Sequence, residues 1–293
     1  MLLETARDHP DEIALDDTTR RRTWRELVDR SARTARVLAE AGVAPGGHAA
    51  VLMDNRVEYV EILLGAVMAG VWLTPINRHL QADEIAYILE DSGARLVFVD
   101  DDSAQHARSA GVPLLRAGDE LESAIAAVAP RSADGELSGP VLDAPAGAAM
   151  IYTSGTSGRP KGVKRVRRAT VGETLAGFVD AGRALGLDGS GPHLVTGPLY
   201  HAAPLMFAVY DLAAGAPMTI MPRWNERHFL ELASERRARH THLVPTMFVR
   251  LLRALDAEPT LGRPPCLDLV LHGAAPIPPE VKRRMIDWWG PVL

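Results

Sequence analysis

The amino-acid sequence predicts an α/β fold with mostly parallel sheets that are flanked by helices and arranged in two lobes. Along most of the 293 residues, short apolar runs of strand length alternate with segments whose apolar residues recur at helical spacing. This alternation favours parallel sheets that helices cover on both faces. Residues 130–147 are rich in Pro, Gly, Ala and Ser, and we interpret them as a surface segment that crosses between the lobes.

The first predicted lobe comprises residues 1–129. Thr23 and Glu26 have the Thr-x-x-Glu spacing of a capping box, which predicts a helix from this point to about Gly42. The other elements expected in this lobe are strands at residues 49–53, 71–73 and 95–99, and helices at residues 56–69 and 82–90.

The second predicted lobe comprises residues 148–293 and begins with an apolar run at residues 148–151, which we expect to be a strand. Further strands are expected at residues 194–196, 218–221, 242–244 and 267–271, and helices at residues 169–185, 225–239, 246–255 and 279–289. The motifs that carry chemistry all fall in this lobe.

The composition indicates a cytoplasmic enzyme. A net charge of −5 gives no reason to expect nucleic acid or an anionic membrane as partner. The longest apolar run, residues 62–73, is shorter than the roughly 20 residues of a membrane-spanning helix, so no integral membrane segment is expected. The polar N-terminus is unlike a signal peptide. Cys266 is the single cysteine, and no Cys/His cluster has zinc spacing.

A loop of unusual composition follows the apolar run at 148–151. Residues 152–163 read Tyr-Thr-Ser-Gly-Thr-Ser-Gly-Arg-Pro-Lys-Gly-Val. Glycines let backbone N–H groups approach a phosphate closely, hydroxyls add donors, and a lysine adds positive charge. The pattern is not a Walker A loop, because Pro160 stands where that motif needs its second glycine and Gly162 where it needs Ser or Thr. An ordinary polar turn is the alternative.

This loop resembles the phosphate loop of the adenylate-forming superfamily, which includes acyl-CoA synthetases, aryl-CoA ligases, luciferases and the adenylation domains of peptide synthetases. Three later segments resemble motifs of the same superfamily in the same order: residues 198–204 (Pro-Leu-Tyr-His-Ala-Ala-Pro), 244–246 (Val-Pro-Thr) and 272–276 (His-Gly-Ala-Ala-Pro). The strongest resemblance is to bacterial acyl-CoA synthetases of the fatty-acyl or bile-acid type. It implies the incomplete N-terminal large domain of the adenylate-forming fold.

The resemblance implies ATP, Mg²⁺ and coenzyme A as cofactors, and a fatty or bulky carboxylic acid as substrate. In this reaction a carboxylate attacks the α-phosphate of ATP to give an acyl-adenylate and pyrophosphate, and the thiol of coenzyme A then displaces AMP. Lys161 and His201 are the residues expected to be catalytic. Lys161 would neutralise phosphate charge, and His201 would lie at the mouth of the acyl tunnel. The alternatives are a surface lysine and a packed histidine.

The resemblance also assigns residues to each part of the ligands. The phosphates are assigned to Thr153, Ser154, Gly155, Thr156, Ser157, Gly158 and Lys161. The adenine is assigned to His272, Gly273, Ala274, Ala275 and Pro276. The acyl pocket is assigned to Tyr200, His201, Ala202, Ala203, Val244 and Thr246, of which the small ones leave room for a bulky chain. No metal ligand is expected beyond contacts from Thr153 or Thr156.

The sequence ends at Leu293, before the Tyr-Gly-x-Thr-Glu type segment, the ribose-binding aspartate and the C-terminal domain of the resembled family. We therefore expect the N-terminal part of a synthetase, inactive alone, with exposed apolar surface that favours aggregation or a homo-oligomer. One alternative is a split enzyme whose C-terminal half is supplied in trans. The other is a non-catalytic protein that binds nucleotide or acyl ligands.

Overall fold

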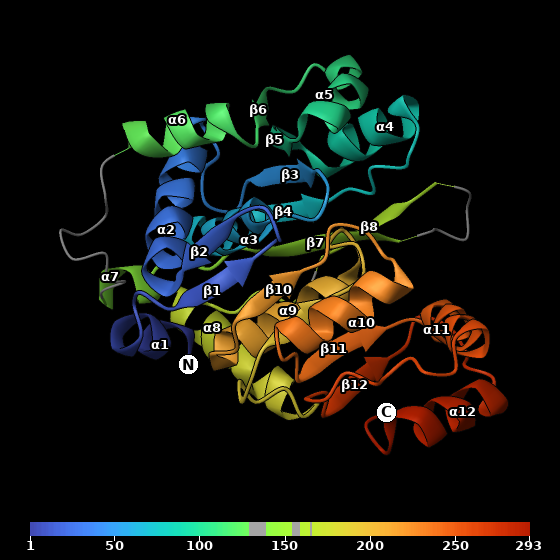
Figure 1. The fold of residues 1–293 in the computed structure, drawn as a ribbon. Helices are drawn as coiled ribbons and strands as arrows, with labels where there is room; N and C mark the ends of the chain where they lie inside the picture. The colour runs from blue at the N-terminus through green and yellow to red at the C-terminus, as the bar shows by residue number, and fades with distance from the viewer. Residues whose placement is uncertain (129–138, 154–158, 165) are drawn as a thin grey trace.

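The computed structural model contains two six-stranded sheets with helices between and around them (Figure 1). It describes residues 1–128, 139–153, 159–164 and 166–293. The first sheet has the order β6-β5-β3-β4-β7-β8 and consists of β3 (His48–Leu52), β4 (Trp72–Pro75), β5 (Ala94–Val99), β6 (Leu114–Arg116), β7 (Ala148–Thr153) and β8 (Lys161–Lys164).

The second sheet has the order β12-β11-β9-β10-β1-β2. It consists of β1 (Ile13–Asp16), β2 (Arg21–Thr23), β9 (His193–Val195), β10 (Met218–Ile220), β11 (His240–Leu243) and β12 (Leu269–His272). Among the described strands, the pairs β1–β2 and β7–β8 are antiparallel and all other neighbours are parallel. The predicted α/β fold with mostly parallel sheets is therefore confirmed.

The two faces of each sheet belong to different cores, because successive side chains of a strand point to opposite faces. In β3, Ala49 and Val51 belong to the core between the sheets, whereas Ala50 and Leu52 belong to a core on the outer face. The second sheet has a separate outer core that includes Leu194 of β9. Helices therefore form a central layer and two outer layers.

The central layer consists of α2 (Trp24–Glu40), α3 (Val57–Ala69), α8 (Val171–Arg183) and α9 (Ala202–Ala214). The first sheet is covered on its outer face by α4 (Ala82–Ser92) and α5 (Asp101–Ala107). The second sheet is covered by α10 (Glu226–Glu235), α11 (Pro245–Ala257) and α12 (Pro279–Trp289). The remaining helices are α1 (Leu2–Asp8), α6 (Asp119–Ala127), α7 (Gly139–Leu142) and the 3₁₀ turn η1 (Arg108–Ala110).

The predicted lobe boundary does not coincide with the division between the sheets. β1 and β2, from the first predicted lobe, lie in the second sheet, where Leu15 pairs with Met218 of β10. β7 and β8, from the second predicted lobe, lie in the first sheet, where Leu73 of β4 pairs with Ala149. Each sheet thus contains strands from both parts of the chain. Of the predicted crossing segment 130–147, residues 130–138 lie outside the described residues.

Most predicted helices and strands are present, and the capping box is confirmed. Thr23 caps α2: its hydroxyl accepts from the Glu26 amide at 3.2 Å, and the Glu26 carboxylate accepts from the Thr23 amide at 2.7 Å. The sequence interpretation missed α9, which begins inside the pocket motif at residues 198–204 and continues to Ala214. The apolar residues of α9 surround the helix, so it lacks the one-sided spacing that identifies a surface helix.

A buried hydrogen-bonded cluster joins α9 to the second sheet. The carboxylate of Asp211 on α9 accepts hydrogen bonds from Nδ1 of His193 at 3.0 Å and from Nδ1 of His240 at 2.7 Å. These histidines begin β9 and β11, at the ends of the strands away from the predicted ligand-binding motifs. Burial would raise the pKa of Asp211, but the hydrogen bonds outweigh burial and lower that pKa to about 2.

Replacing this carboxylate should destabilise the protein in a pH-dependent way. The pKa of Asp211 is lowered from 3.8 to about 2, so Asp211→Asn should reduce the free energy of unfolding by about 2 kcal/mol at pH 7. The stabilisation is complete above the unfolded-state pKa and is lost as the pH falls from 3.8 toward 2. Urea unfolding at several pH values measures this difference. Asp180→Asn, at an exposed position on α8, is the control. A pH-independent difference would contradict the prediction.

Candidate active site

Three of the predicted motifs follow three neighbouring strands. Residues 198–204 follow β9, residues 244–246 follow β11, and residues 272–276 begin at the last residue of β12. These strands are parallel and adjacent, with Leu243 of β11 in register with His272 of β12. Their carboxyl ends therefore meet at one edge of the second sheet, which is where ligands bind in open α/β sheets.

His201 is the N-cap residue of α9 and lies on the surface. Its ring centroid is 4.6 Å from that of Tyr200. Partial burial lowers the pKa of His201, so the ring is mainly neutral at pH 7 and offers one donor and one acceptor. Ala202 and Ala203, in the first turn of α9, are half-buried. Val244 caps α11 and is half-buried, whereas Thr246 in its first turn is exposed.

Asn55, which the sequence interpretation did not identify, holds the Tyr200 segment in place. Its Nδ2 donates to the carbonyls of Gly197 and Met221, each at 3.0 Å, and its Oδ1 accepts from the Leu199 amide at 2.8 Å. Asn55 follows β3 of the first sheet, so one side chain fixes loops of the second sheet against the first. A cavity of about 300 Å³ beside it is lined by residues from the carboxyl ends of strands in both sheets, Tyr200 among them.

The predicted adenine turn is open to solvent. Ala274, Ala275 and Pro276 are exposed, and a Cβ added at Gly273 would meet no atom within 4 Å. Ala274 has φ of +65°, a left-handed conformation that is uncommon for a residue with a side chain.

His272 is held on two sides. Its Nε2 lies 3.1 Å from Nζ of Lys282 on α12, and its ring packs edge-on at 6.0 Å from Phe248. Burial and the Lys282 ammonium lower the pKa of His272. The neutral imidazole therefore accepts from Lys282 through Nε2 and carries its proton on Nδ1.

The two described residues of the predicted phosphate site face each other across a hairpin. Thr153 of β7 and Lys161 of β8 are paired in the antiparallel register, and both are exposed. An exposed ammonium beside an exposed hydroxyl can bind an anion. Ser154, Gly155, Thr156, Ser157 and Gly158 lie outside the described residues.

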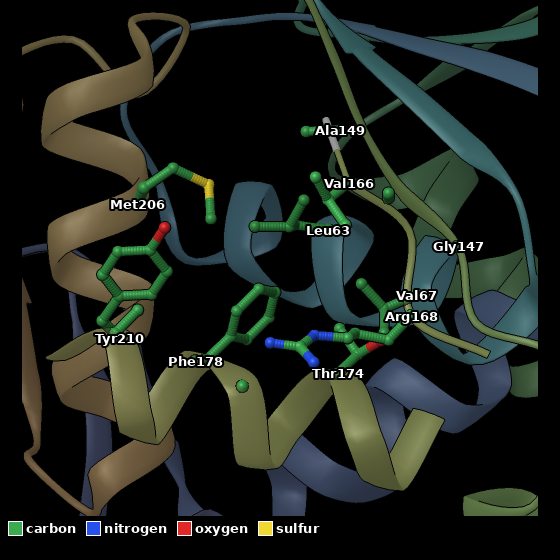
Figure 2. A pocket seen from close by; sticks show the side chains of 13 residues that line it. Leu63, Val67, Gly147, Ala149, Val166, Arg168, Thr174, Phe178, Met206 and Tyr210 are labelled. Atoms are coloured by element: carbon green, nitrogen blue, oxygen red, sulfur yellow. The ribbon is translucent and has the colours of Figure 1, made fainter. Parts of the chain in front are cut away.

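An apolar cavity of about 330 Å³ lies in the central layer, between α3, α8, α9 and β7. Figure 2 shows Met206 and Tyr210 of α9, Phe178 of α8 and Leu63 of α3 around this space. Ala202, Met206 and Tyr210 are four residues apart, which places them along one face of α9. The cavity therefore lies on the helix that begins next to His201, on the face that Ala202 shares.

The described residues hold neither a metal-binding cluster nor a membrane-spanning helix. No group of three or more His, Cys, Asp or Glu side chains there is arranged to hold a metal ion. No helix in the described part of the chain has the length and apolar character needed to cross a bilayer.

Comparison with known proteins identifies the family. The profile of a family described as AMP-binding enzyme matches residues 2–293. The chain belongs to the AMP-binding enzyme family. Its relatives include 2-succinylbenzoate–CoA ligase of Geobacillus kaustophilus, 31% identical over 270 residues, which are 92% of this chain and 52% of that protein. A long-chain-fatty-acid–CoA ligase of Mycobacterium tuberculosis is 27% identical over 263 residues, 88% of this chain and 51% of that protein.

Solved structures of AMP-binding enzymes share the fold. The inhibitor-bound N-terminal domain of FACL13 from Mycobacterium tuberculosis superposes with a TM-score of 0.83 at 26% identity, covering 98% of this chain and 72% of that one. The chain spans about half the length of the curated relatives it matches. The predicted family and the adenylate-forming N-terminal fold are therefore confirmed.

Removing the Lys282 ammonium should raise the pKa of His272, because a positive charge beside the ring disfavours its protonation. Lys282→Met tests this, with the histidine ring signals followed by NMR as a function of pH. Lys164→Met is the matched control, since it removes the same charge from β8 in the other sheet. An unchanged His272 titration in Lys282→Met would show that the two side chains do not interact in solution.

Proposed function

We propose that this chain binds ATP and a carboxylic acid and takes part in forming an acyl-adenylate, the first step of acyl-CoA synthesis. A carboxylate oxygen attacks the α-phosphorus, the bond to the bridging oxygen breaks, and pyrophosphate leaves. The sulfur of coenzyme A then attacks the acyl carbon and AMP leaves. The observation that carries this proposal is the meeting of the Tyr200, Val244 and His272 segments at the carboxyl ends of adjacent strands.

The described side chains suit distinct parts of this reaction. Thr153 and Lys161 would bind the phosphates, where a point charge neutralises the polyphosphate. A neutral His201 can donate a hydrogen bond to a phosphate oxygen at the start of α9. The open turn at Gly273 leaves room for an adenine ring. Mg²⁺ would offset phosphate charge when bound, and of its two predicted contacts, Thr153 and Thr156, Thr153 lies within the described residues.

The apolar cavity of the central layer is the proposed site for the acyl group. Its walls are mostly hydrocarbon, with Leu63, Phe178 and Met206 among them, and burial of an aliphatic or bulky acyl group there is favourable by roughly 25 cal/mol per Å². One relative is named for 2-succinylbenzoate and another for a long-chain fatty acid, and acids of such different shape support a roomy apolar site for the acyl group. A cytoplasmic location, a homo-oligomer and a partner in trans remain predictions.

Mg·ATP binding by this chain, measured by isothermal titration calorimetry, is the first test. A folded sample that binds neither ATP nor AMP would contradict the proposal. Carboxylate-dependent exchange of pyrophosphate into ATP then tests whether the chain alone makes the adenylate. We expect binding with little or no exchange, because the chain spans about half the length of its curated relatives.

Removal of the lysine charge should weaken ATP binding selectively. Lys161→Ala should lower the affinity for ATP by about 10- to 100-fold, since a charge-assisted contact contributes roughly 1.5–3 kcal/mol. Affinity for AMP, which lacks the β- and γ-phosphates, should change little. Lys164→Ala, on the same exposed strand, is the control. Equal ATP affinity in Lys161→Ala and wild type would remove Lys161 from the phosphate site.

Filling the apolar cavity should block acyl ligands without affecting the nucleotide. Ala181 of α8 lines the cavity, so Ala181→Phe should reduce binding of a long-chain fatty acid by at least about 10-fold, by occupying its space. Ala184→Phe, at the exposed end of the same helix, is the matched control. Fatty-acid titration and ATP titration together measure the effect. Retention of fatty-acid binding by Ala181→Phe would place the acyl group elsewhere.

A further inference from the structure

Two side chains of α4 contact β7, which carries Thr153, and the residue that precedes Lys161 of β8. Oη of Tyr152, in β7, donates to the carboxylate of Asp91 at 2.5 Å. Oη of Tyr87 donates to the carbonyl of Pro160 at 3.2 Å. Tyr152 directly precedes Thr153, and Pro160 directly precedes Lys161. Each hydrogen bond therefore acts one residue away from a side chain of the phosphate site.

A third contact reinforces the Tyr87 side of this arrangement. The guanidinium carbon of Arg159 lies 5.1 Å from the centroid of the Tyr87 ring, within the range of a cation–π interaction. Burial and the Asp91 carboxylate both raise the pKa of Tyr152, so its hydroxyl stays protonated and remains a donor.

The two strands differ in how well the rest of the structure holds them. β8 lies at the edge of its sheet, pairs with β7, and all four of its residues are exposed; its contact with the core is that of Lys164, whose Nζ lies 5.0 Å from the centroid of the Trp72 ring. α4, by contrast, is anchored in the outer core by Ile85, Ile88 and Leu89. Tyr87 and Asp91 are four residues apart and so share one face of this helix. The Tyr87 hydrogen bond thus connects the residue before this weakly held strand to a well-anchored helix, and the Tyr152 hydrogen bond connects the neighbouring strand β7 to the same helix.

We propose that α4 anchors the β7–β8 hairpin, and that Tyr87 and Asp91 are positioning residues that hold Lys161 and Thr153 for the β- and γ-phosphates of ATP. The proposal rests on the proposed nucleotide-binding function. The ammonium of Lys161 and the hydroxyl of Thr153 must be held in place when a polyphosphate binds. The conformational entropy that these groups lose on binding reduces the affinity. The hydrogen bonds from α4 restrict the β7–β8 hairpin before the nucleotide binds, so less entropy is lost on binding.

The test compares ATP with AMP. Tyr87→Phe and Tyr152→Phe each remove one hydroxyl and keep the ring, and Asp91→Ala removes the acceptor. Each variant should bind Mg·ATP about five-fold more weakly, as measured by isothermal titration calorimetry. This factor corresponds to the net free energy of about one hydrogen bond. AMP has no β- or γ-phosphate, so its affinity should be unchanged. Glu90→Ala removes the same charge from the neighbouring exposed position of α4 and should behave as wild type.

The outcomes separate this proposal from the proposed function. Equal ATP affinity in wild type and all three variants overturns the anchor and leaves nucleotide binding intact. An equal loss of ATP and AMP affinity also overturns it, because that result indicates a general loss of structure. Failure of the wild type to bind either nucleotide overturns both proposals.

Amide hydrogen exchange provides a measurement that does not depend on the nucleotide. In Tyr87→Phe and Tyr152→Phe, the amides of residues 161–164 should exchange about five-fold faster than in wild type, because the β7–β8 pair opens more often when one of the two bonds that anchor it is lost. Glu90→Ala should leave these rates unchanged. Equal rates in wild type and the two Phe variants would show that α4 does not restrain β8.

Discussion

The position of α3 is the constraint on which the rest of the structure depends. Every residue from Val57 to Met68 is buried, although Glu58 and Glu61 are charged. Unpaired carboxylates in such a place would cost several kcal/mol each. Glu58 pairs with Arg20, which directly precedes β2, and with Arg56, the N-cap residue of α3 itself. Glu61 pairs with Arg22 of β2 and Arg30 of α2. Each carboxylate must lie within reach of its arginines. This requirement fixes the position of α3 along its axis and its rotation about that axis.

The geometry of the candidate site depends on the position of α3. Asn55 lies two residues before α3, and the first amide of the helix, that of Val57, donates to the carboxylate of Asp17 at 3.1 Å. With α3 fixed, Asn55 is fixed, and its three hydrogen bonds set the path of the chain through Gly197 and Leu199 into α9. Leu63 and Val67, two turns further along α3, form one wall of the apolar cavity. The histidine at the start of α9 and the cavity beside it are thus positioned by one buried helix.

A feature could be predicted from the sequence when its interacting residues lie close together along the chain. The capping box at Thr23 was predictable because both partners lie within one helical turn. The motifs at Tyr200, Val244 and His272 were recognisable as local patterns, and parallel strand order then brings them together. Asn55 carries no local signal, since its partners are 142 to 166 residues away. β1 could not be assigned to the second sheet for the same reason, because its partner β10 lies near residue 218.

Polar and apolar surfaces lie in different parts of the candidate site. The strand ends present backbone and polar side chains to solvent, which suits a nucleotide whose phosphates need donors and positive charge. The central layer offers hydrocarbon walls from α3, α8 and α9, which suits a chain that must leave water. α9 connects the two, because His201 caps it at the strand ends and Met206 and Tyr210 line the cavity further along. A carboxylate at His201 with its apolar part along α9 would therefore satisfy both environments at once.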